Sequence, residues 1–277
     1  MTATAPAPVR VAAVQMVSTA SLPANLAAAE SLIAQAAAGG AELVALPEYF
    51  CLMGMKDEDK VAARETDGSG PVQDFLAAQA QRHQITLVGG TVPLATEAPQ
   101  RVRNSVLVYG PGGERIARYD KIHLFNFRKD AESYDEARTI EPGAQVSTFR
   151  FSSRAGTSLK VGLSVCYDLR FPELYRAMAQ PDLILVPAAF TATTGRAHWT
   201  TLLKARAIEN LAYVLAPAQG GRHENGRATY GHSVLIDAWG AVVAERDEGA
   251  GVVIGEVDPH LIATVRSNLP ALTHRVM

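Results

Sequence analysis

The fold of this chain is decided near its N-terminus, by VRVAAVQM (residues 9–16), NLAAAESLIAQAAAGG (residues 25–40) and ELVALPE (residues 42–48). The first run is rich in β-branched residues, and the second places Ala and Leu at helical spacing before a Gly-Gly cap signal. The third is another apolar run, which ends at Pro47. Together they predict a strand–helix–strand unit, with the carboxylate of Glu48 just beyond the end of a strand.

The same alternation continues along the chain, with hairpins between some of the strands. Residues 104–109 and 115–121 flank a Gly-Pro-Gly-Gly sequence and are predicted to form a hairpin. Residues 121–143 show no clean periodicity, and residues 220–230 are polar and glycine-rich, so both are predicted to be loops. The other predicted elements are helices at residues 72–83, 172–179, 196–211 and 259–268, and strands at residues 85–92, 159–166, 183–187, 212–216, 233–237, 241–246 and 252–257.

This order of elements predicts the α/β class, because strands that alternate with helices form mixed sheets covered by helices. No linker and no internal repeat of about 20–50 residues interrupts the pattern, so we expect residues 9–277 to form one domain. The Thr-, Ala- and Pro-rich residues 1–8 lack the basic and apolar regions of a signal peptide. They are predicted to be a short disordered tail.

Composition argues against several classes of function. The net charge is −2 and no run of Lys or Arg occurs, so nucleic acid is not an expected partner. No apolar stretch approaches the roughly 18 residues of a membrane span, and the seven histidines lack metal-binding spacing. The two cysteines, Cys51 and Cys166, show no CxxC pattern, which favours free thiols in a reducing compartment. We therefore expect a soluble, cytoplasmic protein without a metal or a membrane partner.

Cys166 is the strongest candidate for chemistry. It ends an apolar strand and precedes a predicted helix, whose first N–H groups are free to hold an oxyanion. The alternatives are a buried core thiol or a redox thiol, although no resolving cysteine lies nearby in sequence. Glu48 and Lys121 also lie at strand ends, where α/β sheets collect ligand-contacting groups, although each taken alone is better explained as a solvated side chain. Together the three side chains are chemically consistent, because a carboxylate accepts the thiol proton and a lysine stabilises thiolate and oxyanion.

Three blocks of sequence resemble the catalytic blocks of the nitrilase superfamily of carbon–nitrogen hydrolases: LPE (residues 46–48), KIHLF (121–125) and CYDLRFPEL (166–174). The resemblance implies a four-layer α-β-β-α sandwich that pairs as a homodimer. It also implies an amidase without a cofactor, in which Glu48 is the general base, Lys121 stabilises the oxyanion and Cys166 is the nucleophile. The backbone N–H of Tyr167 would join Lys121 in the oxyanion hole.

The resemblance further implies a second glutamate near the site, in the segment between the lysine and the cysteine. Glu136 is the expected residue, and Glu132 is the alternative. In this scheme the nucleophile forms a thioester with the acyl part of a small amide, and water then hydrolyses that thioester.

Other segments resemble the branch of the superfamily that contains deaminated glutathione amidase and ω-amidase: PAAF (residues 187–190), TG (194–195) and AQGGRH (218–223). This resemblance implies hydrolysis of deaminated glutathione to 2-oxoglutarate and Cys-Gly. The alternatives are an ω-amidase acting on 2-oxoglutaramate or another small aliphatic amide, and, from a different class, a catalytically silent dimeric scaffold.

Substrate-binding residues are expected in these same segments. Arg222 and His223 would meet the Cys-Gly carboxylate, unless Arg222 is simply solvated. Arg170 would meet the 2-oxo acid, unless it pairs with Glu173 or Asp168. The other expected substrate-binding residues are Tyr49, Phe190 and Thr194.

Overall fold

In the computed structural model, which describes residues 6–129 and 132–276, the first strand, β1 (Val9–Gln15), is buried on both faces. Val11 and Ala13 contribute to a core shared by two sheets, whereas Val14 contributes to a second core under helices. Because successive side chains of a strand point to opposite faces, β1 must have a sheet on one side and helices on the other.

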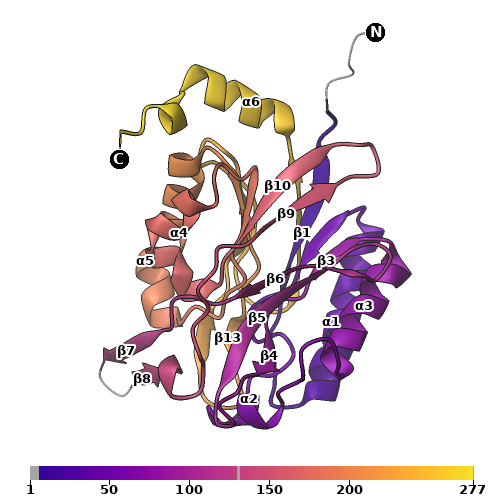
Figure 1. The fold of residues 1–277 in the computed structure, drawn as a ribbon, viewed down its shortest axis with the longest axis vertical. Coiled ribbons are helices and arrows are strands. Elements are labelled where there is room, and N and C mark those ends of the chain that lie inside the picture. Colours follow the sequence, from indigo (N-terminus) through magenta and orange to yellow (C-terminus); the bar gives the residue numbers. More distant parts are fainter. Residues whose placement is uncertain (1–5, 130–131, 277) are drawn as a thin grey trace.

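The first sheet contains seven strands in the order β17-β1-β2-β3-β5-β4, with β6 paired to β5. Strands β1, β2 and β3 run parallel, while β17 and β5 join them antiparallel. Helices α1 and α3 cover its outer face (Figure 1). The bounds are β2 (Leu43–Ala45), β3 (Thr86–Val88), β4 (Val92–Ala95), β5 (Val102–Tyr109), β6 (Arg115–Asp120), β17 (Gly251–Val257), α1 (Leu22–Ala38) and α3 (Pro71–His83).

The second sheet contains six strands in the order β16-β15-β12-β11-β10-β9, of which β10, β11 and β12 run parallel. Helices α4 and α5 cover its outer face (Figure 1). The bounds are β9 (Thr148–Ser152), β10 (Ser158–Leu163), β11 (Leu183–Leu185), β12 (Tyr213–Ala216), β15 (Ser233–Ile236), β16 (Val242–Arg246), α4 (Pro172–Ala177) and α5 (Ala192–Asn210).

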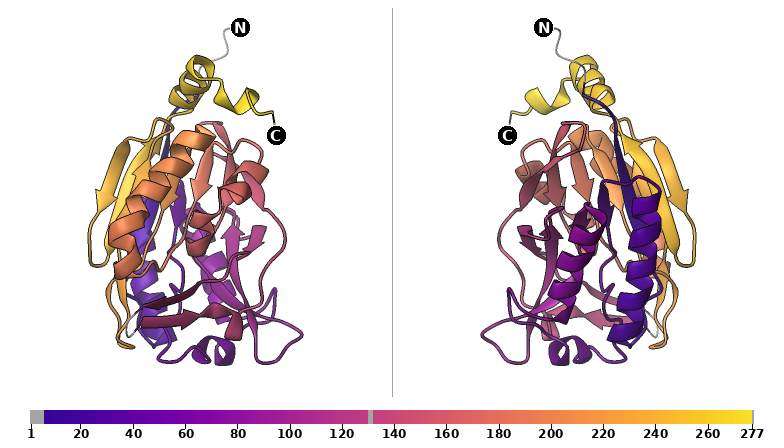
Figure 2. Two further views of the ribbon diagram at one scale, coloured as in Figure 1. Left: turned by 90° about the vertical axis from the view of Figure 1, so that its left-hand side faces the viewer. Right: turned by 90° about the vertical axis from the view of Figure 1, so that its right-hand side faces the viewer.

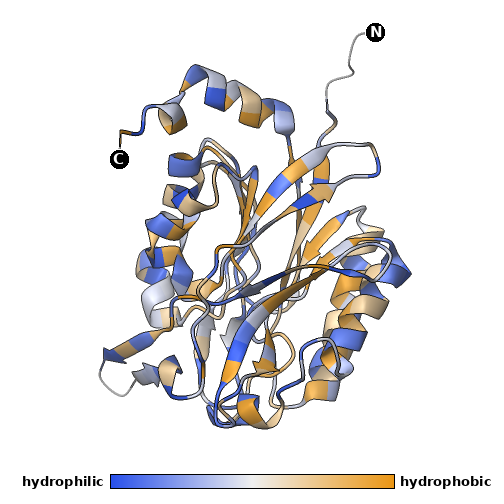
Figure 3. Cartoon of the chain, viewed as in Figure 1, coloured by the Kyte–Doolittle hydropathy of each residue, from blue (hydrophilic) through white to orange (hydrophobic). Residues whose placement is uncertain are grey.

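The two sheets pack face to face, so the chain forms the α-β-β-α sandwich that the resemblance implies. Figure 2 shows α5 in front of one sheet in the left view, and α1 and α3 in front of the other in the right view. Hydrophobic residues concentrate in the central strands, whereas the helices carry both kinds of residue (Figure 3). Helix α6 (Pro259–Asn268), followed by the 3-10 turn η3 (Ala271–Thr273), lies at the end of the sandwich where both termini emerge. Among the described residues, no helix combines the length and apolar character that a membrane span requires.

The prediction of loops at residues 121–143 and 220–230 is wrong in part, because each region contains a short hairpin. Strands β7 (Asn126–Lys129) and β8 (Glu132–Asp135) form the first, and β13 (Gly220–Arg222) and β14 (Ala228–Tyr230) form the second. These strands have only three or four residues and lie partly exposed, so they carry no periodic apolar pattern.

Other boundaries also differ from the sequence expectation. The strand predicted at residues 85–92 is two strands, because the chain turns at Gly89-Gly90 between β3 and β4. A short helix, α2 (Asp59–Ala62), and the 3-10 turns η1 (Glu136–Arg138) and η2 (Cys166–Arg170) were not predicted. The hairpin predicted around residues 110–113 is confirmed by the antiparallel pairing of β5 with β6.

Residues 1–5 of the predicted tail lie outside the described residues. Residues 6–8 are exposed, and the Ala7 carbonyl accepts a hydrogen bond of 2.7 Å from the Thr157 hydroxyl. This part of the predicted tail therefore contacts the sandwich.

Gly90 provides a test of how tightly the turn before Glu48 is packed. Its φ is +50°, and a β-carbon there would lie 2.1 Å from the Pro47 carbonyl oxygen. We expect Gly90→Ala to lower the free energy of unfolding by at least about 3 kcal/mol, because left-handed strain and a steric clash add together. Gly68→Ala is the matched control, since its φ is +88° and nothing lies within 4 Å. It should lose only about 1–2 kcal/mol. Equal losses of unfolding free energy for the two variants, measured by urea denaturation, would contradict the predicted clash.

Candidate active site

Three of the predicted site residues come together because parallel strands of both sheets end at one end of the sandwich. Glu48 follows β2, Lys121 follows β6 and Cys166 follows β10. The pairing of β10 with β11 continues past the ends of both strands, since the Cys166 N–H donates to the Pro187 carbonyl at 3.0 Å. The carboxyl ends of strands thus deliver side chains from distant parts of the sequence to one place.

Cys166 begins η2, in a strained turn shortly after the end of β10. Its φ is +48°, which is uncommon for a residue other than glycine. Left-handed backbone costs roughly 1–2 kcal/mol for an L-residue, so the surrounding contacts must hold it in place. As the sequence predicts, the chain turns sharply here from a strand into a helical segment, and it lifts the thiol out of the sheet.

The carboxylate of Asp168 is the main contact that holds this turn. It is fully buried and accepts hydrogen bonds from the Val165 N–H at 2.8 Å and the Tyr119 hydroxyl at 2.7 Å. It also accepts from the His123 N–H at 3.0 Å, and it lies 2.7 Å from His123 Nδ1. Asp168 therefore ties the cysteine turn of the second sheet to the lysine segment of the first.

Lys121 lies between two buried carboxylates. Its Nζ is 2.9 Å from Glu48 Oε1, and 2.9 and 2.8 Å from the two oxygens of Glu136. The Glu48 carboxylate also accepts hydrogen bonds from Asn104 Nδ2 at 2.9 Å and from the Ala189 N–H at 3.0 Å. Every charge in this cluster is therefore paired and held in a fixed orientation.

Glu136 reaches Lys121 from η1. It accepts further hydrogen bonds from the Tyr49 hydroxyl at 2.9 Å and from the Phe125 N–H at 2.7 Å. The side chain of Glu132, the alternative second glutamate, lies outside the part of the chain that the structure describes. Glu136 thus has the geometry expected of a second site glutamate, and its role stays a prediction.

The electrostatics keep Lys121 charged and the thiol protonated. Burial alone lowers the pKa of Lys121, but Glu136 and Glu48 more than offset it and raise the pKa above its usual value. Burial raises the pKa of Glu136, and Lys121 overcomes this effect, so that pKa is lowered. Burial also raises the pKa of Cys166, and the charge and hydrogen bond of Glu48 raise it further while Lys121 lowers it. The arrangement places a neutral thiol beside a carboxylate that can accept its proton.

These side chains open onto a pocket of about 340 Å³. Lys121 is fully buried beneath the two glutamates, and the pocket itself is lined by predicted site residues and by others that were not predicted. The predicted ones are Glu48, Tyr49, Glu136, Cys166, Tyr167, Phe190 and Thr194, and the others are Phe125, Ala189, Thr191 and Arg227.

Arg222 and His223, which were expected to bind substrate, do not line this pocket. Arg222 is exposed at the end of β13. The His223 ring is buried, with Nδ1 2.8 Å from the Ser18 carbonyl and Nε2 2.8 Å from the Thr229 hydroxyl. Both ring nitrogens are thus used in holding the hairpin, and a substrate contact for His223 stays a prediction that this geometry does not support.

Arg170 also lies beside the pocket rather than in its wall. Its guanidinium stacks over the rings of Tyr167 and Phe190, at 5.9 and 5.4 Å from their centroids. Its hydrogen-bond partner is His198 Nδ1 at 3.3 Å, not Glu173 or Asp168. Arg170 supports two lining rings, and the structure does not place it in contact with the pocket.

The basic residue that does line the pocket is Arg227, five positions beyond Arg222. The sequence shows an arginine in this glycine-rich region, but it does not show which side of the hairpin faces the pocket. The antiparallel pairing of Arg222 with Ala228 sets that direction. Only this register separates an exposed arginine from one in the pocket wall.

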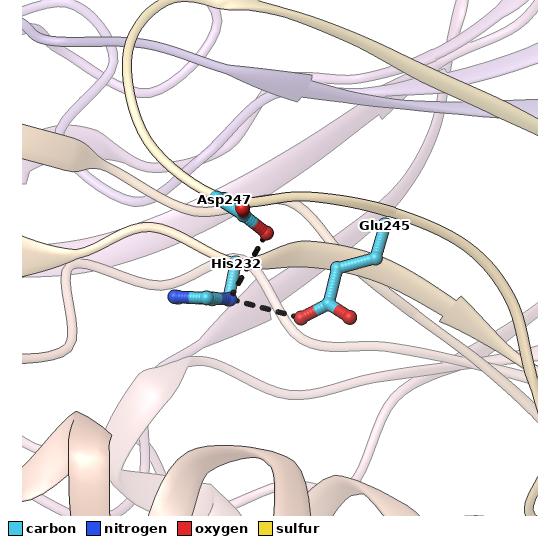
Figure 4. A group of neighbouring side chains, drawn as sticks. All are labelled: His232, Glu245 and Asp247. Atoms are coloured by element: carbon cyan, nitrogen blue, oxygen red, sulfur yellow. Dashed lines mark hydrogen bonds and ion pairs between the residues drawn. The ribbon is translucent and has the colours of Figure 1, made fainter.

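One group of three potential metal ligands occurs among the described residues: His232, Glu245 and Asp247 (Figure 4). His232 Nδ1 is 2.9 Å from Glu245 Oε1, and the backbone N–H of His232 donates to the Asp247 carbonyl at 2.7 Å. These bonds hold His232 at a φ of +53°. None of the three lines the pocket, and hydrogen bonding between the neighbouring ends of β15 and β16 accounts for the cluster.

Comparison with known proteins places this geometry in a family. The carbon-nitrogen hydrolase family model matches residues 10–267. A deaminated glutathione amidase of Synechocystis is 43% identical over 97% of this chain and 98% of its own length. Saccharomyces cerevisiae Nit3, a member of branch 10 of the nitrilase superfamily, has a TM-score of 0.86 at 29% identity, covering 98% of this chain and 97% of that one.

A third relative carries a modified active-site cysteine. This is a glutamate-to-glutamine mutant of an amidase from Nesterenkonia, in which acrylamide has added to the active-site cysteine. It is 25% identical with a TM-score of 0.77, over 95% of this chain and 98% of that one. On the family match across most of its length, this chain belongs to the carbon–nitrogen hydrolase family and is a hydrolase of carbon–nitrogen bonds other than peptide bonds.

Proposed function

We propose that this enzyme hydrolyses deaminated glutathione to 2-oxoglutarate and Cys-Gly, with Cys166 as the nucleophile. The observation that carries the proposal is the cluster of Glu48, Lys121 and Cys166 at one small pocket. The substrate is suggested by the Synechocystis relative, which is named deaminated glutathione amidase and matches almost the whole chain.

In the first half-reaction the Cys166 thiol passes its proton to Glu48 as its sulfur attacks the amide carbonyl carbon. A tetrahedral intermediate forms, and its oxyanion is stabilised by Lys121 and by the Tyr167 N–H. Tyr167 lies in the first turn of η2, where N–H groups have no intrahelical acceptor. The carbon–nitrogen bond then breaks, Glu48 returns the proton to the leaving amine, and a thioester remains on Cys166.

In the second half-reaction Glu48 removes a proton from water, which attacks the thioester carbonyl. The carbon–sulfur bond breaks, the acid is released, and the thiol recovers its proton through Glu48. Glu48 is suited to this double role because Asn104 Nδ2 and the Ala189 N–H fix its orientation. Glu136 acts by holding Lys121 charged and in position.

The alternative substrate is 2-oxoglutaramate, which shares the 2-oxoglutaryl acyl group but releases ammonia. The pocket is small, with about 340 Å³ of space even when the part open to solvent is included, and this favours the smaller amide. The two substrates differ only on the amine side, so kinetics separates them.

We also infer that the enzyme is a homodimer and works in the cytoplasm, the latter because both cysteines are free thiols. Trp239 is 62% exposed and Ile208 is 49% exposed. Gly240, which follows Trp239 in the sequence, lies close to Ile208, because a β-carbon at Gly240 would lie 2.7 Å from Ile208 Cδ1. An exposed apolar patch of this kind is typical of an interface between subunits.

The substrate proposal is tested by kcat/KM for deaminated glutathione and for 2-oxoglutaramate. We expect wild type to prefer deaminated glutathione by about a hundredfold. Cys166→Ala should lose at least about a thousandfold because no thioester can form. Cys51→Ala is the matched control and should keep its activity, since Cys51 lies away from the pocket lining. Equal or reversed preference would assign the enzyme to 2-oxoglutaramate.

The protonation state of Cys166 is tested by alkylation with iodoacetamide. Its pKa is raised, so wild type should react slowly at pH 7 and faster as the pH rises past the ordinary thiol value of about 8.5. Glu48→Gln removes a charge that raises this pKa and leaves Lys121 to lower it. That variant should be inactive as an amidase, yet alkylated about tenfold faster at pH 7.

Mass spectrometry of the Cys166 peptide measures the rate, and Cys166→Ala gives the background from Cys51, whose burial raises its pKa to about 12. Alkylation of Glu48→Gln that is no faster than wild type would show that Glu48 does not control the thiol.

The dimer is tested by light scattering after chromatography of Ile208→Ser/Trp239→Ser. We expect monomers, because the variant loses the apolar patch that two subunits would bury. Ile116→Ser is the control, since Ile116 is 39% exposed on β6 and outside the patch. A double variant that stays dimeric would place the interface elsewhere.

A further inference from the structure

Arg227 is the charged residue of the pocket wall that the reaction scheme does not use. The carboxylates of Glu48 and Glu136 are both bound to Lys121. In contrast, none of the carboxylates that the structure describes forms an ion pair with Arg227. Its guanidinium lies over the Tyr134 ring, with Cζ 4.7 Å from the ring centroid. A half-buried guanidinium with free donors at a substrate pocket is an incomplete site for an anion.

The chain holds Arg227 in a fixed turn. The Arg227 N–H donates to Asn225 Oδ1 at 3.0 Å, and the His223 N–H donates to the Arg227 carbonyl at 2.9 Å. The buried His223 ring anchors the same turn through Thr229. Little backbone ordering would therefore be needed when an anion binds, which favours a preformed binding residue.

Arg227 lies between the pocket that holds the reacting groups and a neighbouring hollow. Arg227 and Tyr49 line both the pocket at Cys166 and an adjacent hollow of about 250 Å³. That hollow is also lined by Lys56, Lys60 and Asp57. A ligand that extends from Cys166 toward this boundary meets positive charge.

The local charges allow two roles for Arg227. Glu48, Glu136 and Lys121 together carry one net negative charge, which Arg227 would offset. Burial lowers the pKa of Arg227, but Tyr49, Tyr134 and Glu136 more than compensate, so its pKa lies above the usual value. If charge balance were its only role, removing Arg227 would affect every amide equally. If it binds an anion, the effect would depend on the charge of the substrate.

We propose that Arg227 binds a carboxylate of the substrate, so that the site selects amides that carry this group over neutral amides of similar shape. This inference rests on the proposed function in its choice of substrates. A planar guanidinium suits the task because it can donate two parallel hydrogen bonds to one carboxylate. Both proposed substrates carry a carboxylate at the far end of the acyl group, and deaminated glutathione carries a second one on its amine side.

The test compares Arg227→Gln with wild type on four amides: deaminated glutathione, 2-oxoglutaramate, glutaramate and pentanamide. The last two have similar chains and differ in the terminal carboxylate. We expect kcat/KM to fall about 10- to 100-fold for the carboxylate-bearing amides, mainly through KM, because charged hydrogen bonds are lost. Pentanamide should change little. Arg128→Gln is the matched control, since it removes an exposed positive charge from the nearby hairpin and should leave all four rates unchanged.

The pattern of losses identifies the carboxylate. Losses on all three charged amides assign Arg227 to the acyl-side carboxylate, and a loss on deaminated glutathione alone assigns it to the amine side. Either result supports the proposal. Equal losses on pentanamide and glutaramate, or no losses at all, would overturn it.

Binding separates this proposal from the substrate assignment. Calorimetry should show that 2-oxoglutarate binds Cys166→Ala, and that Cys166→Ala/Arg227→Gln binds it 10- to 100-fold more weakly. If wild type is inert on deaminated glutathione while Arg227-dependent binding persists, only the substrate assignment fails. If 2-oxoglutarate does not bind, or binds both variants equally, Arg227 does not bind the acyl-side carboxylate. Deaminated glutathione is then titrated into the same two variants, and equal binding of that ligand as well would show that the role of Arg227 is wrong.

Discussion

The site depends on one buried lysine ammonium group held between two carboxylates. Removing one partner of a buried ion pair typically costs about 3–5 kcal/mol, because an uncompensated charge remains. Lys121 follows β6, Glu48 lies in the turn after β2 and Glu136 lies in η1. Their pairing therefore fixes the positions of these three segments relative to one another. The pairing also sets the chemistry: burial raises the pKa of Cys166 most, Glu48 raises it further, and Lys121 lowers it.

Asp168 extends this constraint to the second sheet. Its buried carboxylate bonds to the Val165 N–H on one side, and to Tyr119 and His123 on the other. The cysteine turn, which has an unfavourable backbone conformation, is thereby tied to the segment that carries Lys121. The face-to-face packing of the two sheets brings the segments within reach, and hydrogen bonds of this single carboxylate keep them in register. The reacting groups therefore lie on rigid strand ends, which suits a reaction that depends on fixed geometry.

Much of this arrangement is predictable from sequence because it is local. Glu48 and Cys166 follow short apolar runs, and the ends of such runs can be read directly from the residues. The α/β class is also predictable, since the strands of β1 to β3 and β10 to β12 read as apolar segments between helices. The four layers are expected only from the resemblance to the family. What the sequence does not show is the direction of side chains in short, partly exposed hairpins. Arg222 and Arg227 look equivalent in the sequence, and only the register of β13 with β14 separates them. Similarly, His223 resembles a ligand-binding residue until both of its ring nitrogens are seen to hold the hairpin.

The central claim is a thioester on Cys166 that is common to all substrates with the same acyl group. Competition between water and hydroxylamine for this intermediate tests the claim directly. The thioester no longer contains the leaving group, so its partition between the two nucleophiles should not depend on which amide formed it. Deaminated glutathione and 2-oxoglutaramate should give the same ratio of 2-oxoglutaryl hydroxamate to 2-oxoglutarate at each hydroxylamine concentration, and Cys166→Ala should give neither product. A ratio that changes with the leaving group, or hydrolysis by Cys166→Ala at the wild-type rate, would contradict the thioester mechanism.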